Sequence, residues 1–222
     1  MQRLGSPSWR LSVTANPHTI AVALFVRESL DLPVPPSPYT PPRCGERIPH
    51  REVDFSDAAR QEAGRQWLAW WCQLVDVEFL LHPPIPPAGD EHALARRQLA
   101  ELQRVFDPPA FEALSASPAL RTAVLATFDD ARGHGSAPEA RQRRHVEARF
   151  DRQLTRDLVA ALIAEHGVSP DRLNASLLLI DAPVHWHHIT RPGAAICSTA
   201  ITTDPSAAES LLRAVFTSGL RN

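Results

Sequence analysis

The sequence predicts a mainly α-helical protein, a helical bundle with a small C-terminal β element (a hairpin) and a closing helix. Two observations support this prediction. Apolar residues recur at intervals of three and four residues as far as His166, which is typical of helices, and short apolar runs replace them after about residue 174. The chain has 222 residues, 44% of them hydrophobic and 22% charged, which suits one soluble core.

The first 55 residues combine one helix with an extended segment. Asn16 can cap a helix that starts at Pro17 and ends near Leu30, because proline suits a first helical position. Residues 32–42 are rich in proline and must be extended. This strap either lies on the body, as we favour, or serves as a docking ligand for an aromatic groove. We therefore divide the chain into residues 1–55 and a helical domain of residues 56–222, with a single core overall.

Residues 56–82 read as one long helix that Pro83 and Pro84 end. Its second half is apolar around most of its circumference, so we expect its aromatic residues, among them Trp71, to be buried. Glu78 lies inside this apolar face. A buried carboxylate needs a partner or a proton, and His82, one turn later, is the local candidate.

Further helices are predicted in the middle of the chain. One starts at Asp90, and its inward stripe would be Ala95, Leu99, Leu102 and Phe106. A short helix follows Asp107, and another runs from Ser117 to about Gly133. A long helix from Pro138 to His166 ends at Gly167, which suits a C-terminal cap.

The C-terminal part predicts strands. Residues 176–180 form a short apolar run, and residues 185–190 and 194–203 flank a Pro192-Gly193 turn. A two-residue turn would place His188 opposite Cys197, a pairing that either activates the thiol or, as we favour, leaves a core cysteine. Asp204 then caps the closing helix.

Composition excludes several chemistries. All 23 basic residues are arginine, so a standard P-loop, Schiff-base chemistry and a standard kinase lysine are excluded. This residue usage indicates a GC-rich bacterial genome. Three widely spaced cysteines (Cys44, Cys72 and Cys197) do not suggest a disulfide framework, and the apolar runs are too short to span a membrane. We predict a cytoplasmic protein.

One pattern suggests a metal site. In a strand, alternate residues share a face, so His185 and His187 would project together. Two imidazoles can share an ion, and Asp181 or Glu78 could complete its ligands. The chemistry would be that of a metal-dependent enzyme using Zn, Fe or Mn.

A second pattern suggests anion binding. Five basic residues would share one face of the helix predicted over 138–166, and arginine binds phosphates and carboxylates well. A net charge of −2 favours a solvated, salt-bridged surface over a nucleic-acid site. The five residues are Arg141, His145, Arg149, Arg152 and Arg156.

The leading functional hypothesis is a non-enzymatic helical interaction protein, a subunit, adaptor or accessory factor that binds a protein partner or itself. The helical bulk, the five tryptophans and the lack of a catalytic motif favour it. The metal-dependent enzyme is the alternative, and anion or nucleic-acid binding is third. No membrane partner is expected.

Overall fold

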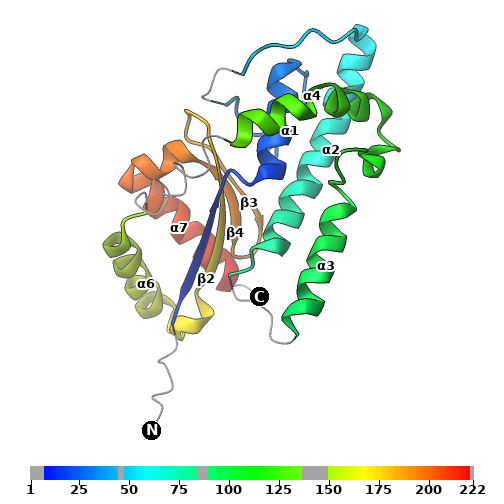
Figure 1. Ribbon diagram of the computed structural model, residues 1–222. Coiled ribbons are helices and arrows are strands. Elements are labelled where there is room, and N and C mark those ends of the chain that lie inside the picture. The colour runs from blue at the N-terminus through cyan, green and yellow to red at the C-terminus, as the bar shows by residue number, and fades with distance from the viewer. Residues whose placement is uncertain (1–7, 45–47, 85–89, 137–149, 221–222) are drawn as a thin grey trace.

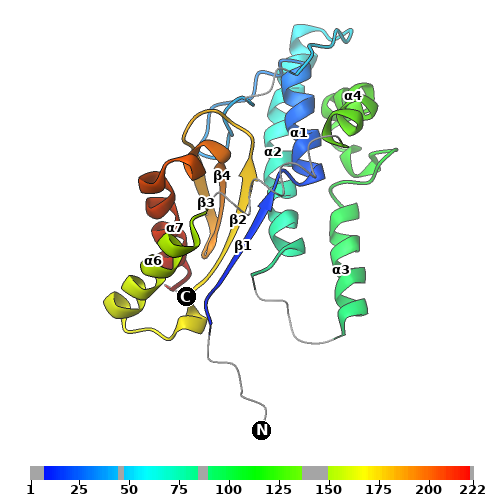
Figure 2. The ribbon, with the colours of Figure 1, turned by 60° about the vertical axis from the view of Figure 1, so that its left-hand side comes forward.

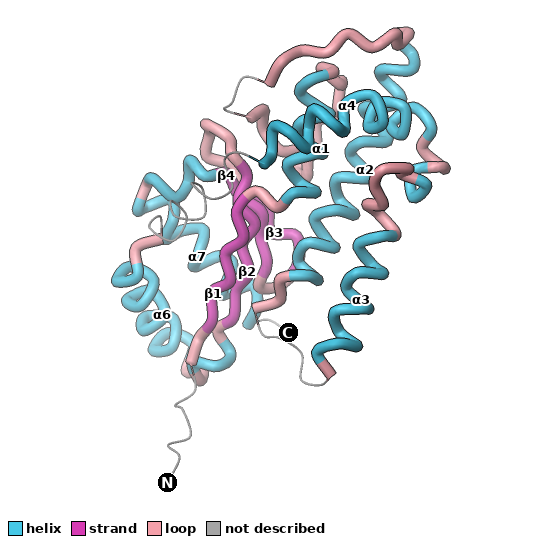
Figure 3. The backbone as a smooth tube through the Cα atoms, viewed as in Figure 1, coloured by secondary structure: helices cyan, strands magenta, loops and turns pink. Residues whose placement is uncertain are grey.

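The computed structural model describes residues 8–44, 48–84, 90–136 and 150–220. A four-stranded mixed sheet lies between two groups of helices (Figures 1 and 2). The strands are β1 (Arg10–Ala15), β2 (Asn174–Ile180), β3 (His187–Arg191) and β4 (Ala194–Ser198), in the order β1-β2-β4-β3. Neighbouring pairs β1–β2 and β2–β4 are parallel, and β3 runs antiparallel to β4 at one edge. The strands lie together as one layer, magenta in Figure 3.

Helices cover both faces of this sheet. On one face lie α1 (His18–Ser29), α2 (Asp57–Leu81), α3 (Glu91–Gln103) and α4 (Pro118–Ser136), with α3 outermost and α2 between it and the sheet (Figures 1 and 2). On the other lie α6 (Arg152–His166) and α7 (Pro205–Leu220). Short 3-10 helices occur at η1 (Glu112–Leu114), η2 (Pro170–Arg172) and η3 (Thr199–Thr203).

The sheet separates two hydrophobic cores. In β2, Leu178 and Ile180 pack toward α1, α2 and α4, whereas Leu177 and Leu179 pack toward α6 and α7. Successive side chains of a strand point to opposite faces, so a strand covered on both faces is apolar throughout. The apolar run predicted as a buried strand is therefore confirmed as β2, a central strand of the sheet.

The predicted fold class is wrong because the β structure is not a C-terminal hairpin attached to a helical bundle. Strand β1 comes from the first segment of the chain, where we expected no strand, and pairs with β2 from Arg10–Asn174 to Ala15–Leu179. Leu11 and Val13 point to the face of the sheet that α6 and α7 cover, so β1 does follow the alternating pattern of a strand. Its partner lies more than 160 residues later, and local periodicity does not reveal such a pairing.

Helix ends follow the predicted capping in part. Ser56 accepts a hydrogen bond from Ala59 N at the start of α2, and Gly167 closes α6 with a φ of 63°. The helix predicted from Pro138 to His166 is not continuous, because Phe150 and Asp151 are not helical. Asp151 instead caps α6 by accepting hydrogen bonds from the backbone N–H groups of Gln153 and Leu154. Residues 137–149 lie outside the described part of the chain.

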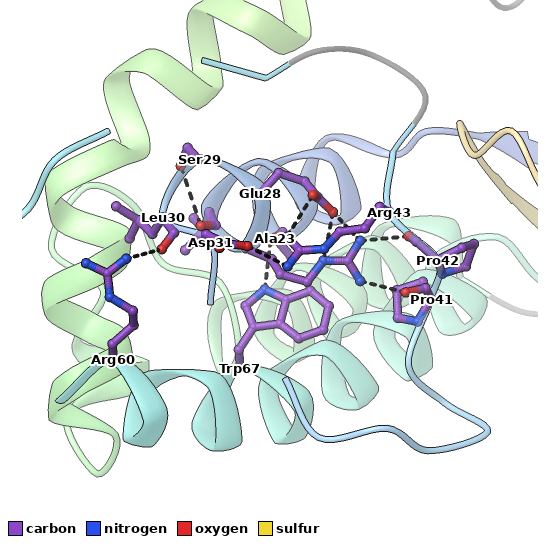
Figure 4. Close-up of polar contacts among 12 residues, drawn as sticks. Ala23, Glu28, Ser29, Leu30, Asp31, Pro41, Pro42, Arg43, Arg60 and Trp67 are labelled. Carbon is purple, nitrogen blue, oxygen red and sulfur yellow. Dashed lines mark hydrogen bonds and ion pairs between the residues drawn. The ribbon is translucent and has the colours of Figure 1, made fainter. Parts of the chain in front are cut away.

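The Pro-rich strap lies on the body, as we favoured. Buried Arg27 of α1 donates through Nη1 to the Pro41 carbonyl and through Nη2 to the Pro42 carbonyl, both at 2.7 Å, and its guanidinium carbon lies 5.1 Å from the Trp67 ring centroid (Figure 4). The Trp71 indole donates to the Tyr39 carbonyl at 3.0 Å. The strap therefore adds to the core around α1 and α2, where its Leu32 is buried.

Candidate functional site

The residues predicted as metal ligands are not brought together. His185, in the loop before β3, and His187, at its first position, are exposed, whereas Glu78 is buried in α2. Among the described residues, which include Asp181, no three His, Cys, Asp or Glu side chains are placed to hold one metal ion. The carboxylates of Glu78 and Asp181 instead bind parts of the fold itself.

Asp181 joins the ends of three parallel strands. Asn16, Asp181 and Thr199 are the first residues after β1, β2 and β4. The Asp181 N–H donates to Asn16 Oδ1 at 3.1 Å, and Thr199 Oγ1 donates to Asp181 Oδ1 at 3.2 Å. Asn16 was expected to cap α1, but α1 has no side-chain cap because the Asn16 oxygen is used here. Ligands of α/β sheets often bind at this edge, yet each of these bonds serves the chain's own loops.

Glu78 is 3% exposed and links α1 to α2. Its Oε1 accepts a hydrogen bond from Thr19 Oγ1 at 2.5 Å, and its Oε2 lies 3.5 Å from His82 Nε2. Burial raises the pKa of Glu78, and the Thr19 hydroxyl and the charge of His82 oppose this effect. His82 lies within ion-pair distance as predicted, but the hydrogen bond comes from Thr19, which is 59 residues away and which no local pattern of the sequence indicated.

The expected pairing of His188 with Cys197 is wrong by one residue. An irregularity between Ile189 and Arg191 shifts the register, so His187 lies opposite Cys197 and His188 opposite Ile196. Cys197 is fully buried, and burial raises the pKa of its thiol to about 12. A thiolate nucleophile is therefore disfavoured, and His188 packs its ring against Tyr39 with 4.3 Å between the ring centroids.

The predicted arginine face is described only at one end. Arg152 and Arg156 are exposed in the first half of α6. The other three predicted members, Arg141, His145 and Arg149, lie outside the described residues. Anion binding by this set therefore stays a prediction.

The outer face of α3 contradicts the predicted packing. Of its apolar stripe, Phe106 just beyond the helix is buried and Leu102 is half-buried, but Ala95 and Leu99 are exposed. Leu99 is 53% exposed, and α3 contains no buried residue. The sequence pattern was read correctly as amphipathic, but periodicity does not tell whether a neighbouring element covers the stripe.

The contacts that α3 makes with other described residues lie on its inner side, toward α2. Gln98 Nε2 donates to the Leu80 carbonyl at 3.1 Å and to the Leu81 carbonyl at 3.4 Å, which fastens α3 to the last turn of α2. Leu94 and Leu102 are half-buried on this side. We define the α3 outer face as Ala95, Arg96, Leu99, Ala100 and Gln103, all of them exposed.

Comparison with known proteins gives no assignment for this surface: no family model, curated protein or solved structure matches the chain. None of the helices in the described ranges is long and apolar enough to cross a membrane. The candidate functional site is the α3 outer face, because its apolar residues form a pattern for which the described core does not account.

Proposed function

We propose that the protein is a non-enzymatic interaction protein, a subunit, adaptor or accessory factor that contacts a protein partner through the α3 outer face. The observation that carries this proposal is the exposure of Leu99 at the uncovered end of an apolar stripe whose other end is buried. Burying a leucine side chain fully is worth about 1.5–3 kcal/mol, so covering this stripe would favour association.

The length of α3 supports the same function. It has 13 residues, and isolated helices of about 12–15 residues are marginal in water. A helix of this length therefore depends on tertiary packing, yet α3 buries none of its residues in the monomer. A partner on the outer face would supply packing that α2 alone does not.

Other exposed leucines differ in their surroundings. Leu125 of α4 is 49% exposed, but α4 buries Leu120, Ala123 and Val124 against α1 and α2. Single exposed apolar residues on such well-anchored helices are ordinary. Leu125 therefore provides a matched control for Leu99.

The test is site-specific photocrosslinking of the full chain in its host cells. A photoreactive amino acid replaces Leu99 in one variant and Leu125 in the other. We expect a discrete crosslinked protein product from position 99 and none from position 125. Absence of a product at position 99, or the same products at both positions, would contradict the proposed function.

A further inference from the structure

Unpaired positive charge borders the exposed leucine of α3. Arg96, Leu99, Ala100 and Gln103 follow the spacing i, i+3, i+4, i+7, so they form one continuous strip on the exposed side of the helix. Arg96 and Arg97 are exposed, and neither makes a hydrogen bond or ion pair with another residue in the described ranges.

The nearby carboxylate is already used. Glu101 is partly buried and accepts two hydrogen bonds from Arg104 Nη1, at 2.8 and 2.9 Å. The α3 outer face therefore combines an apolar centre with Arg96, and exposed Arg97 lies at its border beside Ala100, three residues on. The described chain leaves the charge of both arginines unmatched, in a protein whose net charge is −2. Electrostatic complementarity across interfaces favours partners of opposite sign at such a surface.

We infer that the partner of this surface is an acidic amphipathic protein segment, one that presents apolar side chains to Leu99 and carboxylates to Arg96 and Arg97. Arginine binds carboxylates through two parallel hydrogen bonds, which fixes orientation as well as sign. A nucleic acid would satisfy the arginines, but its phosphates would not bury Leu99. This inference rests on the proposed function and adds the chemistry of the partner.

The probe is a pair of fluorescent helical peptides of about 15 residues, long enough to form a helix on the surface. Both carry leucine along one face. The acidic peptide has glutamate at the flanking positions, and the basic peptide has lysine there. Binding to the full chain is measured by fluorescence anisotropy at low and at high salt, together with binding of a single-stranded DNA oligonucleotide.

We expect the acidic peptide to bind and the basic peptide not to bind. The double variant Arg96→Glu/Arg97→Glu should weaken acidic-peptide binding at least about tenfold, since reversal adds repulsion to the loss of attraction. Leu99→Gln should also weaken it, and added salt should weaken it further because the arginines are exposed. Glutamate and arginine have similar helix propensities, so α3 should keep its helicity by circular dichroism.

The matched control is Arg65→Glu/Arg132→Glu on α2 and α4, where both arginines are also exposed. It changes the net charge by the same amount away from α3 and should leave acidic-peptide binding unchanged. An equal loss in this control would reduce the effect to overall charge and overturn the inference.

Other outcomes separate the inference from the proposed function. Failure of the acidic peptide to bind, or equal binding of both peptides, overturns the acidic partner. DNA binding that depends on Arg96 and Arg97 but not on Leu99 would replace it by a nucleic acid. In each case a crosslinked product formed from position 99 and not from position 125 keeps the proposed function.

Discussion

Replacing Arg27 by methionine should destabilise the protein strongly. Arg27 is 2% exposed, and its guanidinium donates to the carbonyls of Pro41 and Pro42 and to the Glu28 carboxylate (Figure 4). Methionine fills similar volume but donates no hydrogen bond. The two proline carbonyls and Glu28 would then lose a buried donor, and the strap would lose its attachment to α1.

The magnitude follows from the unpaired groups. A buried acceptor left without its donor costs about 1–3 kcal/mol, and breaking a buried charge pair costs about 3–5 kcal/mol. Because these effects overlap at one side chain, we expect Arg27→Met to lower the free energy of unfolding by about 3–5 kcal/mol. Urea denaturation followed by tryptophan fluorescence measures this change, and Trp67 lies directly beneath the guanidinium.

Arg43→Met is the matched control for this prediction. Arg43 pairs with the same Glu28 at 2.9 Å and with Asp31 at 2.7 Å, but its side chain is 53% exposed. Exposed ion pairs contribute about 0–1 kcal/mol, so this variant should unfold almost as the wild type does. If Arg27→Met costs no more than Arg43→Met, burial does not determine the strength of this network, and our reasoning is refuted.

Three further predictions concern packing and titration. A Cβ atom at Gly64 would lie 2.5 Å from the Pro33 carbonyl oxygen, so Gly64→Ala should cost about 1–3 kcal/mol by urea denaturation. A Cβ atom at Gly133 would meet no atom of the described residues within 4 Å, so Gly133→Ala in α4 should instead stabilise by up to about 1 kcal/mol. Burial raises the pKa of Glu78, so the folded state holds this proton more tightly than the unfolded state does. The resulting contribution to the free energy of unfolding is full below the ordinary glutamate pKa of about 4.3 and is lost as the pH rises through the folded-state pKa. Glu78→Gln should flatten this loss as the pH rises above about 4.3, and an unchanged pH profile would contradict the assignment. Burial raises the pKa of Cys197 to about 12, so thiol reagents should modify this cysteine at neutral pH only when the chain is unfolded.

Local signals predicted most of the helices. The wide apolar face of residues 56–82 predicted α2 with Trp71 buried, and Ser56 begins it as expected. Asp204 caps α7 by accepting a hydrogen bond from Ser206 N. Capping and amphipathic spacing act within one or two turns, so the sequence itself displays them.

Local signals failed where distant segments meet. Asn16 has the side chain of a helix cap, but it accepts from Asp181 N, 165 residues later. The Pro192-Gly193 turn gave the hairpin but not its register, because the irregularity near Ile189 inserts a residue that no two-residue turn rule includes.

The candidate site shows the same division. The sequence pattern predicts the apolar stripe of α3, and it also shows Arg96 and Arg97 close to Leu99 in the chain. Their significance depends on α2 covering only the inner side of α3 and on Arg96 finding no acidic partner in the described chain. Burial and ion pairing are properties of neighbours in space, so the sequence pattern alone assigned Leu99 to the core.

The sequence by itself determined most of the helices, the central apolar strand and the exclusion of lysine-dependent chemistry, because each depends on residue type or short-range spacing. Only the tertiary structure decided that β1 pairs in parallel with β2, that helices cover both faces of the sheet, and that Leu99 remains exposed. The physical reason is that hydrophobic burial and parallel strand pairing join segments far apart in the chain, and their free energy depends on which surfaces meet.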